Sequence, residues 1–153
     1  IWRTNKLKLM KIEIAVYNSE WYQKSLKLRD AELRKPLGLN LFEEDLSDEE
    51  NQIHFVALEN EMVVGVVILV PTYEQATGKL RQMATFEEVR GKGYGKALVV
   101  ALEEYAKQNG MNFILLHARE YAKGFYLKLG YEITSEVFYE VGIPHFEMKK
   151  SLM

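Results

Sequence analysis

The feature that most constrains the fold is a glycine-rich turn that leads directly into a helix. Residues 89–98 read V-R-G-K-G-Y-G-K-A-L, with glycines at alternate positions and cations between them. Residues 79–85 before the turn are strand-like, and residues 96–108 after it carry apolar side chains at helical spacing. The first amides of a helix lack an intrahelical acceptor and carry partial positive charge, and glycine lets a ligand approach the backbone. Strand, glycine-rich turn and helix together predict an anion site.

Spacing separates the known phosphate-binding motifs. A Walker A motif needs Ser or Thr after its Gly-Lys pair, but Ala97 stands there and has no hydroxyl to hold magnesium. A dinucleotide fingerprint that starts at Gly91 needs glycine where the chain has Lys96. It also needs an acid about 20 residues on, where the chain has Leu115 and Leu116. Both motifs are excluded, which leaves another phosphate loop or a plain turn with positive φ and solvated lysines.

The first half of the chain alternates between strand and helix patterns. Residues 11–17 alternate polar and apolar side chains, which is typical of a half-buried strand. A helix is expected to begin after Ser19 as N-cap and to end at Pro36. An irregular acidic stretch follows it. Residues 53–58 and 62–70 then predict a hairpin, because a tight polar connection joins two apolar runs.

The second half continues with alternating elements. Residues 113–117 predict a short buried strand and residues 119–129 a helix. Two further strands are expected at 131–135 and at about 143–150. The order indicates an α/β fold whose sheet has mixed strand direction, without a second domain or an internal repeat.

Composition limits the classes of partner. The net charge of the 153 residues is −2, so no whole-molecule attraction to nucleic acid or an anionic membrane is expected, and a positive site must be local. There is no cysteine, which removes disulfides, thiolate metal sites and a cysteine nucleophile, and suits the cytoplasm. The longest apolar run, 62–70, is too short to span a bilayer.

The first nine residues do not fit the strand pattern that opens at Met10. They carry charge throughout, where a secretion signal needs an apolar stretch. We therefore expect residues 1–9 to be a vector-derived or upstream extension, with a single domain over residues 10–153.

Two short motifs carry a family resemblance. Arg90, Gly93 and Gly95 form R-x-x-G-x-G between a strand and a helix, and residues 125–131 read F-Y-L-K-L-G-Y, with Ala122 three residues before them. Together they resemble the acetyl-coenzyme A pyrophosphate loop and the F-Y-x-x-x-G-F/Y signature of the GNAT superfamily of N-acetyltransferases. The resemblance covers roughly residues 11–150.

The resemblance implies a fold and a co-substrate. The fold is α/β, a GNAT-type mixed, mostly antiparallel central sheet flanked by helices, in the order β-α(-α)-β-β-β-α-β-α-β-β. The co-substrate is acetyl-CoA, with no metal: backbone amides of the turn cradle its pyrophosphate, and the backbone of the strand before the turn pairs with its pantetheine arm. The cofactor-binding residues so implied are Met83, Ala84, Thr85, Arg90, Gly91, Lys92, Gly93, Tyr94, Gly95 and Lys96.

The resemblance also assigns one catalytic role. Tyr126 matches the family tyrosine that protonates the leaving thiolate, and the alternative is a tyrosine that only packs. A base must deprotonate the acceptor ammonium, and the pattern leaves it open. The candidates are His117 and His145, followed by Glu87, Glu88 and Glu140. The family often has an asparagine shortly before its A-x-x-F-Y segment, where this chain has His117-Ala118-Arg119.

The acceptor is the least determined part. Direct acetyl transfer in a ternary complex to a primary amine of a small molecule or peptide is the leading interpretation, because no cysteine can carry an acetyl group. The alternative is a non-catalytic acyl-CoA-binding regulatory module of the same fold. The acidic run 43–50 could attract a cationic acceptor or be a solvated connector, whereas Arg29 or Arg34 could hold a carboxylate. No nucleic-acid or membrane partner is expected, and a homodimer is left open.

Overall fold

The computed structural model describes residues 10–153, which form two compact units. Unit 1 comprises residues 10–69 and 82–102, and unit 2 comprises residues 70–81 and 103–153. The expectation for residues 1–9 lies outside the described residues, and that of one domain over 10–153 stays a prediction. Within residues 10–153, no helix is long and apolar enough to cross a membrane.

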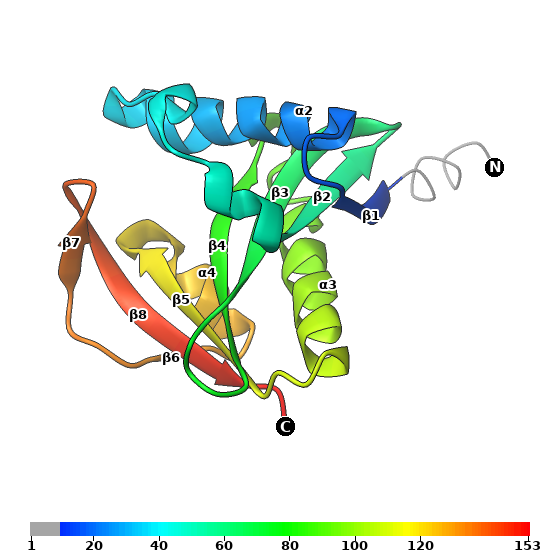
Figure 1. The fold of residues 1–153 in the computed structure, drawn as a ribbon. Coiled ribbons are helices and arrows are strands. Elements are labelled where there is room, and N and C mark those ends of the chain that lie inside the picture. The colour runs from blue at the N-terminus through cyan, green and yellow to red at the C-terminus, as the bar shows by residue number, and fades with distance from the viewer. Residues whose placement is uncertain (1–9) are drawn as a thin grey trace. The chain divides into compact units, whose positions relative to one another are not determined.

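Three antiparallel strands and helix α2 (Glu20–Arg29) belong to the first part of unit 1. The strands are β1 (Met10–Ala15), β2 (Ile53–Glu59) and β3 (Met62–Pro71), which reaches into unit 2 at its end. The predicted hairpin is confirmed: its two turn residues, Asn60 and Glu61, both have positive φ, as a two-residue type I′ connection requires. Figure 1 shows helix α2 (Glu20–Arg29) running across β2 and β3.

The ends of α2 follow its sequence signals. Ser19 caps the helix by accepting from the amide of Tyr22 at 3.3 Å. The helix then loosens into a π-turn (Asp30–Arg34) and a 3₁₀ turn (Lys35–Leu37), and left-handed Gly38 ends it. The acidic stretch beyond contains two more 3₁₀ turns, Leu41–Glu43 and Ser47–Asn51. Its buried anchor is Leu41, which joins the core of unit 1.

Unit 2 is built around strand β5 (Phe113–Arg119). On one side β5 pairs in parallel with the start of β4 (Thr77–Thr85), and on the other it pairs antiparallel with β8 (Ile143–Ser151). Two short strands, β6 (Glu132–Ile133) and β7 (Phe138–Glu140), also pair antiparallel with β8. The fold is therefore the predicted mixed α/β type, with a mostly antiparallel sheet flanked by helices.

Several predicted boundaries differ from the structure at the end of the chain. The helix expected over 119–129 is wrong in its first half, because β5 continues to Arg119 by pairing with β8 and a 3₁₀ turn (Glu120–Ala122) follows. Helix α4 covers only Lys123–Lys128. Strand β7 was not predicted. It forms a hairpin with β8 through Val141 and Gly142, both with positive φ (Figure 1).

Candidate active site

The glycine-rich turn lies in unit 1 and opens helix α3 (Tyr94–Gln108). The Gly93 carbonyl accepts the first helical bond from the Ala97 amide at 3.0 Å. Gly93 is thus the N-cap, and the amides of residues 94–96 are those that lack an intrahelical acceptor. The resemblance assigns these amides to the pyrophosphate, and amides without an intrahelical acceptor can donate to an anion.

The glycines of the turn are required by backbone conformation. Gly91 and Gly93 have φ values of 81° and 90°, in the region that other residues adopt only at a cost. A Cβ added at either position would meet no atom of the described chain within 4 Å. Close packing is therefore not the reason for glycine at these two positions. The space that a side chain would occupy there is open to a ligand.

The cations of the turn have partners that the sequence pattern did not reveal. The Arg90 guanidinium pairs with the Glu32 carboxylate and donates to the Thr85 carbonyl at 3.3 Å. Lys92 lies 4.0 Å from the carboxylate of Glu59. The local positive charge is therefore partly balanced by two acids that come from distant parts of the sequence.

Tyr94 is the buried member of the turn. Its side chain is 6% exposed and hydrogen-bonds to Glu59. Burial, followed by the charge and hydrogen bond of Glu59, raises the pKa of the Tyr94 phenol. Tyr94 thus anchors the start of α3, and its backbone rather than its side chain is placed to contact a ligand.

The predicted cofactor strand is the second half of β4. Ala84 is buried, and Met83 and Thr85 are partly buried. The parallel pairing of β4 with β5 ends at Leu80. The backbone of Met83–Thr85 is therefore not paired with β5. Immediately before it, Gln82 has a left-handed backbone with φ of 59°, unlike the extended backbone of an ordinary strand residue.

A buried polar network lies beside this strand in unit 1. Arg29 is 1% exposed and donates to both carboxylate oxygens of Glu49 at 2.8 and 2.7 Å, and through Nε to Gln82 Oε1 at 3.3 Å. The Tyr22 hydroxyl donates to Glu49 at 2.7 Å, and His54 Nε2 donates to the Glu49 carbonyl at 2.8 Å. Burial alone would raise the pKa of the Glu49 carboxyl, but the bonds from Arg29 and Tyr22 outweigh it and lower that pKa.

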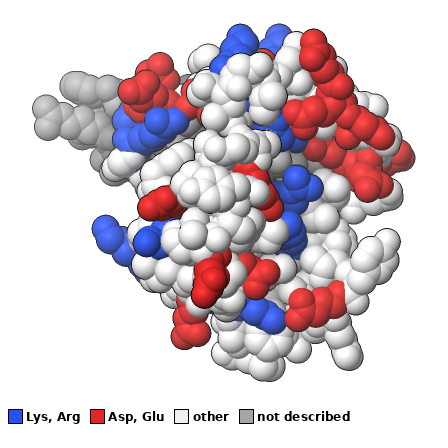
Figure 2. Space-filling view, turned by 90° about the vertical axis from the view of Figure 1, so that its left-hand side faces the viewer, with Lys and Arg blue, Asp and Glu red and all other residues white. Residues whose placement is uncertain are grey.

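This network gives internal partners to several candidates for recognising the acceptor's charge. Arg29, a candidate carboxylate holder, pairs with Glu49 of the acidic run, and Arg34 pairs in the same way with Glu44 at 2.6 Å. Glu49 is 8% exposed, so the run is not wholly a solvated connector. On the face drawn in Figure 2, Asp and Glu side chains gather at the upper right. The two sets of candidates neutralise each other at these pairs.

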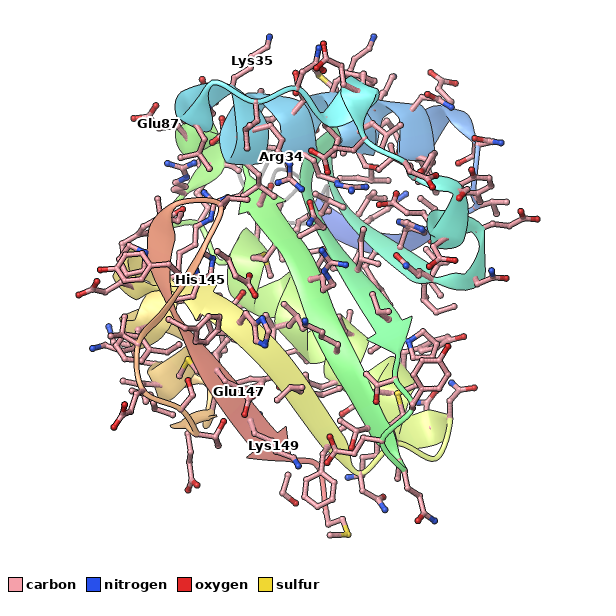
Figure 3. The ribbon with its side chains drawn as sticks, turned by 60° about the vertical axis from the view of Figure 1, so that its left-hand side comes forward. Arg34, Lys35, Glu87, His145, Glu147 and Lys149 are labelled. Atoms are coloured by element: carbon pink, nitrogen blue, oxygen red, sulfur yellow. The ribbon has the colours of Figure 1, made fainter. Side chains whose placement is uncertain are left out.

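In unit 2, three candidate bases meet in one cluster. His117 Nδ1 lies 2.6 Å from Glu140 Oε1, and His145 Nε2 lies 3.9 Å from the other oxygen of the same carboxylate. Glu147 Oε2 lies 4.0 Å from His117 Nε2. The Phe138 ring contacts both imidazoles, edge-on at 5.0 Å from His117 and stacked at 6.0 Å on His145. The side chains come from β5, β7 and β8, and Figure 3 shows those on β8.

The remaining candidates lie elsewhere. Glu87 and Glu88 are exposed on the 3₁₀ turn Glu87–Val89 of unit 1. Tyr126 lies on α4 in unit 2, is 5% exposed, and packs edge-on against Phe125 and Tyr131 with ring centroids 5.0 and 5.7 Å away. Burial raises the pKa of the Tyr126 phenol, which keeps it protonated at neutral pH. That is the state a proton donor needs, and the packing also suits a structural role.

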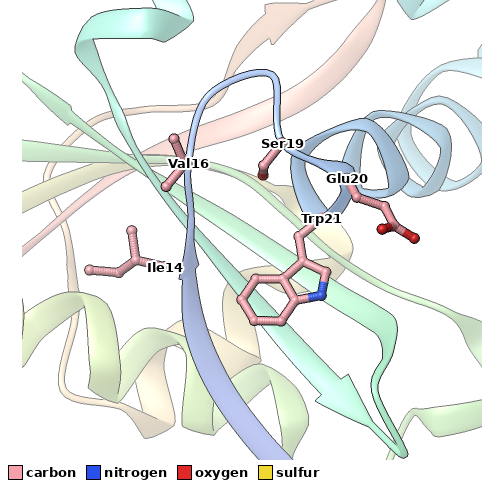
Figure 4. Close-up of a pocket in the computed structure, with 5 residues that line it drawn as sticks. All are labelled: Ile14, Val16, Ser19, Glu20 and Trp21. Atoms are coloured by element: carbon pink, nitrogen blue, oxygen red, sulfur yellow. The ribbon is translucent and has the colours of Figure 1, made fainter.

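One surface hollow contains none of the predicted residues. Figure 4 shows its lining in unit 1. Its volume is about 240 Å³, and its lining residues are Ile14, Val16, Ser19, Glu20 and Trp21. No group of three or more metal-ligating side chains occurs among the described residues.

Comparison with known proteins identifies the class. A glycine-rich turn that opens a helix in a mixed, mostly antiparallel α/β fold is typical of coenzyme A-dependent acyltransferases. The pattern of the family described as "Acetyltransferase (GNAT) domain" matches residues 28–152, so the chain belongs to the GNAT acetyltransferase family.

Individual relatives agree with this assignment. The chain is 34% identical to the uncharacterized N-acetyltransferase YjcF of Bacillus subtilis, over 71% of this chain and 77% of YjcF. A Lactobacillus plantarum protein assigned as an N-acetyltransferase has a TM-score of 0.83 at 27% identity, covering 94% of this chain and 99% of the other. An aminoglycoside 6′-N-acetyltransferase complexed with coenzyme A shares the fold, with a TM-score of 0.76 at 20% identity over 94% and 97% of the two chains. The chain spans about half the length of two further B. subtilis relatives, at 43% and 45% identity.

Proposed function

We propose that the chain is an acetyl-CoA-dependent N-acetyltransferase that moves an acetyl group directly to a primary amine of a small molecule or peptide. The observation that carries the proposal is the backbone of the glycine-rich turn. Gly91 and Gly93 have a left-handed backbone, and an added Cβ at either position would meet no atom of the described chain within 4 Å. The amides of residues 94–96 lack intrahelical acceptors. This is an anion site in a member of the GNAT family, and a structural relative binds coenzyme A.

Bound acetyl-CoA supplies an acetyl thioester. Amides of the turn hold its pyrophosphate, and the Met83–Thr85 backbone offers partners to its amide groups. His117 or His145 removes one proton from the acceptor ammonium, because only the free amine has a lone pair. A C–N bond then forms, the C–S bond breaks, and Tyr126 donates its proton to the leaving thiolate. The amide nitrogen's surplus proton returns to Tyr126 through water.

Glu140 gives a physical reason to place the base at His117. A carboxylate oxygen 2.6 Å from Nδ1 fixes the orientation of the imidazole. Nε2 is then the nitrogen left to face an acceptor. His145 instead has Nδ1 at 2.9 Å from the Ile143 carbonyl and is 5% exposed, so it is less accessible to an acceptor.

The alternative function is acyl-CoA binding without turnover. The burial of Tyr126 favours this alternative. If Tyr126 only packs against its neighbours, the leaving thiolate has no assigned proton donor. A Tyr126→Phe variant separates the two. In the enzyme it keeps its affinity for acetyl-CoA and loses most of its kcat, whereas unchanged kcat removes Tyr126 from the reaction.

The proposal is tested by incubating the protein with acetyl-CoA and a panel of amines and measuring the released thiol with a thiol reagent. The chain has no cysteine, so the signal comes from coenzyme A alone. Thermal shifts with coenzyme A and with ATP give an independent readout, since a ligand that binds the native state raises the melting temperature. A shift with ATP but not with coenzyme A would overturn the proposal. A shift with coenzyme A but no thiol release on any amine would favour the binding module.

A further inference from the structure

One face of the sheet in unit 2 is lined with ionisable side chains. Along β5, alternate residues are buried: Ile114, Leu116 and Ala118. The residues between them, among them Leu115 and His117, lie on the opposite face and are only partly buried. Strand pairing places Lys149 beside Leu115 and Glu147 beside His117 on that same face. This open face, rather than the buried one, can bind a polar molecule.

Two cations on this face have no acidic partner. Lys79 pairs in register with Leu115, and Arg81 follows two residues later on the same face of β4. Among residues 10–153 neither makes an ion pair within 4.0 Å, although Lys149 nearby is satisfied by Glu74 at 3.1 Å and by the Phe113 ring. Burial and the neighbouring charge of Arg81 lower the pKa of Lys79, and Glu140 and Glu147 only partly offset this. A bound anion would relieve the repulsion between the two cations.

The opposite end of the face is anionic. Glu140 gives one carboxylate oxygen to His117 at 2.6 Å, and its other oxygen has only the more distant His145 at 3.9 Å. Glu147 accepts from the Thr134 hydroxyl at 2.8 Å through one oxygen, and its other oxygen lies 4.0 Å from His117. Within the described part of the chain, each carboxylate therefore keeps one oxygen without a close donor, beside the imidazole proposed as base. An ammonium group supplies the donors that these oxygens lack.

We propose that this face of unit 2 is the acceptor site and that the acceptor is a zwitterion, a primary amine that also carries an anionic group. Its ammonium binds at Glu140 and Glu147, next to His117, and its anionic group binds at Lys79 and Arg81. The inference rests on the proposed function. Strand β4, which carries the cations, lies two strand spacings from β8 and three from β7, on the order of 10 and 15 Å between backbones, so the amine and the anion are several bonds apart.

The charge pairs in unit 1 strengthen the choice of this face. Arg29 and Arg34, which could have held a carboxylate, are paired with Glu49 and Glu44. An anion can bind at Lys79 and Arg81, by contrast, without the loss of an ion pair among residues 10–153.

Matched amines test the inference with the wild-type protein. Each ω-amino acid from glycine to 6-aminohexanoate is compared with the n-alkylamine of equal chain length, and 3-aminopropyl phosphate with 3-aminopropanol. Thiol release gives kcat/KM for each. The amino acids, the aminoalkyl phosphate or both are expected to exceed their uncharged partners by about tenfold or more, since hydrogen bonds to charged groups are the strong ones. The two series distinguish a carboxylate from a phosphate as the anion.

Variants locate the two ends. Lys79→Gln and Arg81→Gln are expected to remove most of the preference for the anionic partner by raising KM, with little effect on the n-alkylamines. Glu140→Gln is expected to lower kcat/KM for both members of a pair and to change the pH profile of the remaining activity. Lys149→Gln is the matched control: it lies on the same face with its own acidic partner, and it should leave the preference unchanged.

The outcomes separate this inference from the proposed function. Equal kcat/KM within every matched pair overturns the zwitterion while leaving the acetyltransferase intact. An equal effect of Lys79→Gln and Lys149→Gln on the preference overturns the location of the anion site. Absence of thiol release with every amine, despite a thermal shift with coenzyme A, overturns the proposed enzyme and this inference with it.

Discussion

Arg29 donates through Nε to the side-chain oxygen of Gln82, 3.3 Å away, and Gln82 is the residue of β4 with a left-handed backbone. That conformation costs a residue other than glycine about 1–2 kcal/mol, which its surroundings must offset. Met83–Thr85 follow at once. Arg29, 53 residues earlier in the chain, therefore helps hold the backbone conformation that immediately precedes the predicted cofactor strand.

Replacement of Arg29 tests the strength of this network. Arg29→Met is expected to lower the free energy of unfolding by about 3–5 kcal/mol, because it leaves the buried Glu49 carboxylate without its cation. The double variant Arg29→Met with Glu49→Met should recover a large part of that loss, since two apolar side chains need no counter-charge. Urea denaturation measures both. A single variant as stable as the wild type, or a double variant less stable than the single one, contradicts this account.

His54 predicts a pH dependence of stability. Its Nε2 donates to the Glu49 carbonyl, its Nδ1 has no partner within residues 10–153, and burial lowers its pKa below the ordinary value of 6.5. The unfolded chain therefore binds a proton that the folded chain excludes, and stability falls as pH drops below about 6.5. Glu49, whose pKa is also lowered, loses its contribution only further down, below its ordinary value of 4.5.

A His54→Phe variant isolates this contribution. Urea midpoints measured between about pH 6.5 and 5 are expected to change less with pH in the variant than in the wild type. The variant loses one hydrogen bond, so its stability at pH 8 is the reference for each curve. Parallel curves for the two proteins would show that His54 does not titrate on unfolding.

Substitution of Gly65 is predicted to disturb packing next to the predicted cofactor strand. A Cβ at this position of β3 would lie 3.0 Å from Leu98 Cδ1 and 3.1 Å from Thr85 Cγ2. Gly65→Ala is therefore expected to destabilise the protein by about 1–3 kcal/mol and to weaken coenzyme A binding through displacement of Thr85. Gly124→Ala is the control, because a Cβ there meets nothing within 4 Å and alanine suits its helix. A Gly65→Ala variant as stable as that control would contradict the prediction.

The elements that the sequence predicted well are those with a local signal. The hairpin of β2 and β3 follows from two apolar runs and a short polar link, and α3 follows from helical spacing after the glycines. The end of β5 was misjudged because residues 118–119 extend as a strand by pairing with β8, a contact that no local pattern encodes. The same holds for β7, whose one local hint is Val141-Gly142.

The candidate site divides in the same way. The turn of residues 90–96 is a local motif, so an anion site or a turn with positive φ could be predicted there, and Gly91 and Gly93 have positive φ. The pairing of Arg29 with Glu49 could not, because either residue alone is an ordinary surface charge. The cluster of His117, Glu140 and His145 needed three strands to bring its members together. The sequence indicated each residue as a separate candidate. Their grouping is known only from the distances between their side chains.

Gly93 and Gly110 offer a matched test of the turn. Both have positive φ, 90° and 82°, and an added Cβ at either position meets nothing within 4 Å. Alanine at either position is therefore expected to cost about 1–2 kcal/mol of stability through the same backbone strain. Gly93 caps the start of α3, where the anion is proposed to bind, whereas Gly110 follows its end.

Coenzyme A binding should therefore separate the two variants. Titration calorimetry is expected to show a dissociation constant about tenfold or more higher for Gly93→Ala, because strain moves the donor amides of residues 94–96. Gly110→Ala should bind as the wild type does, despite an equal loss in urea stability. Equal weakening in both variants would mean that affinity follows overall stability, and unchanged affinity in both would remove the turn from the coenzyme A site.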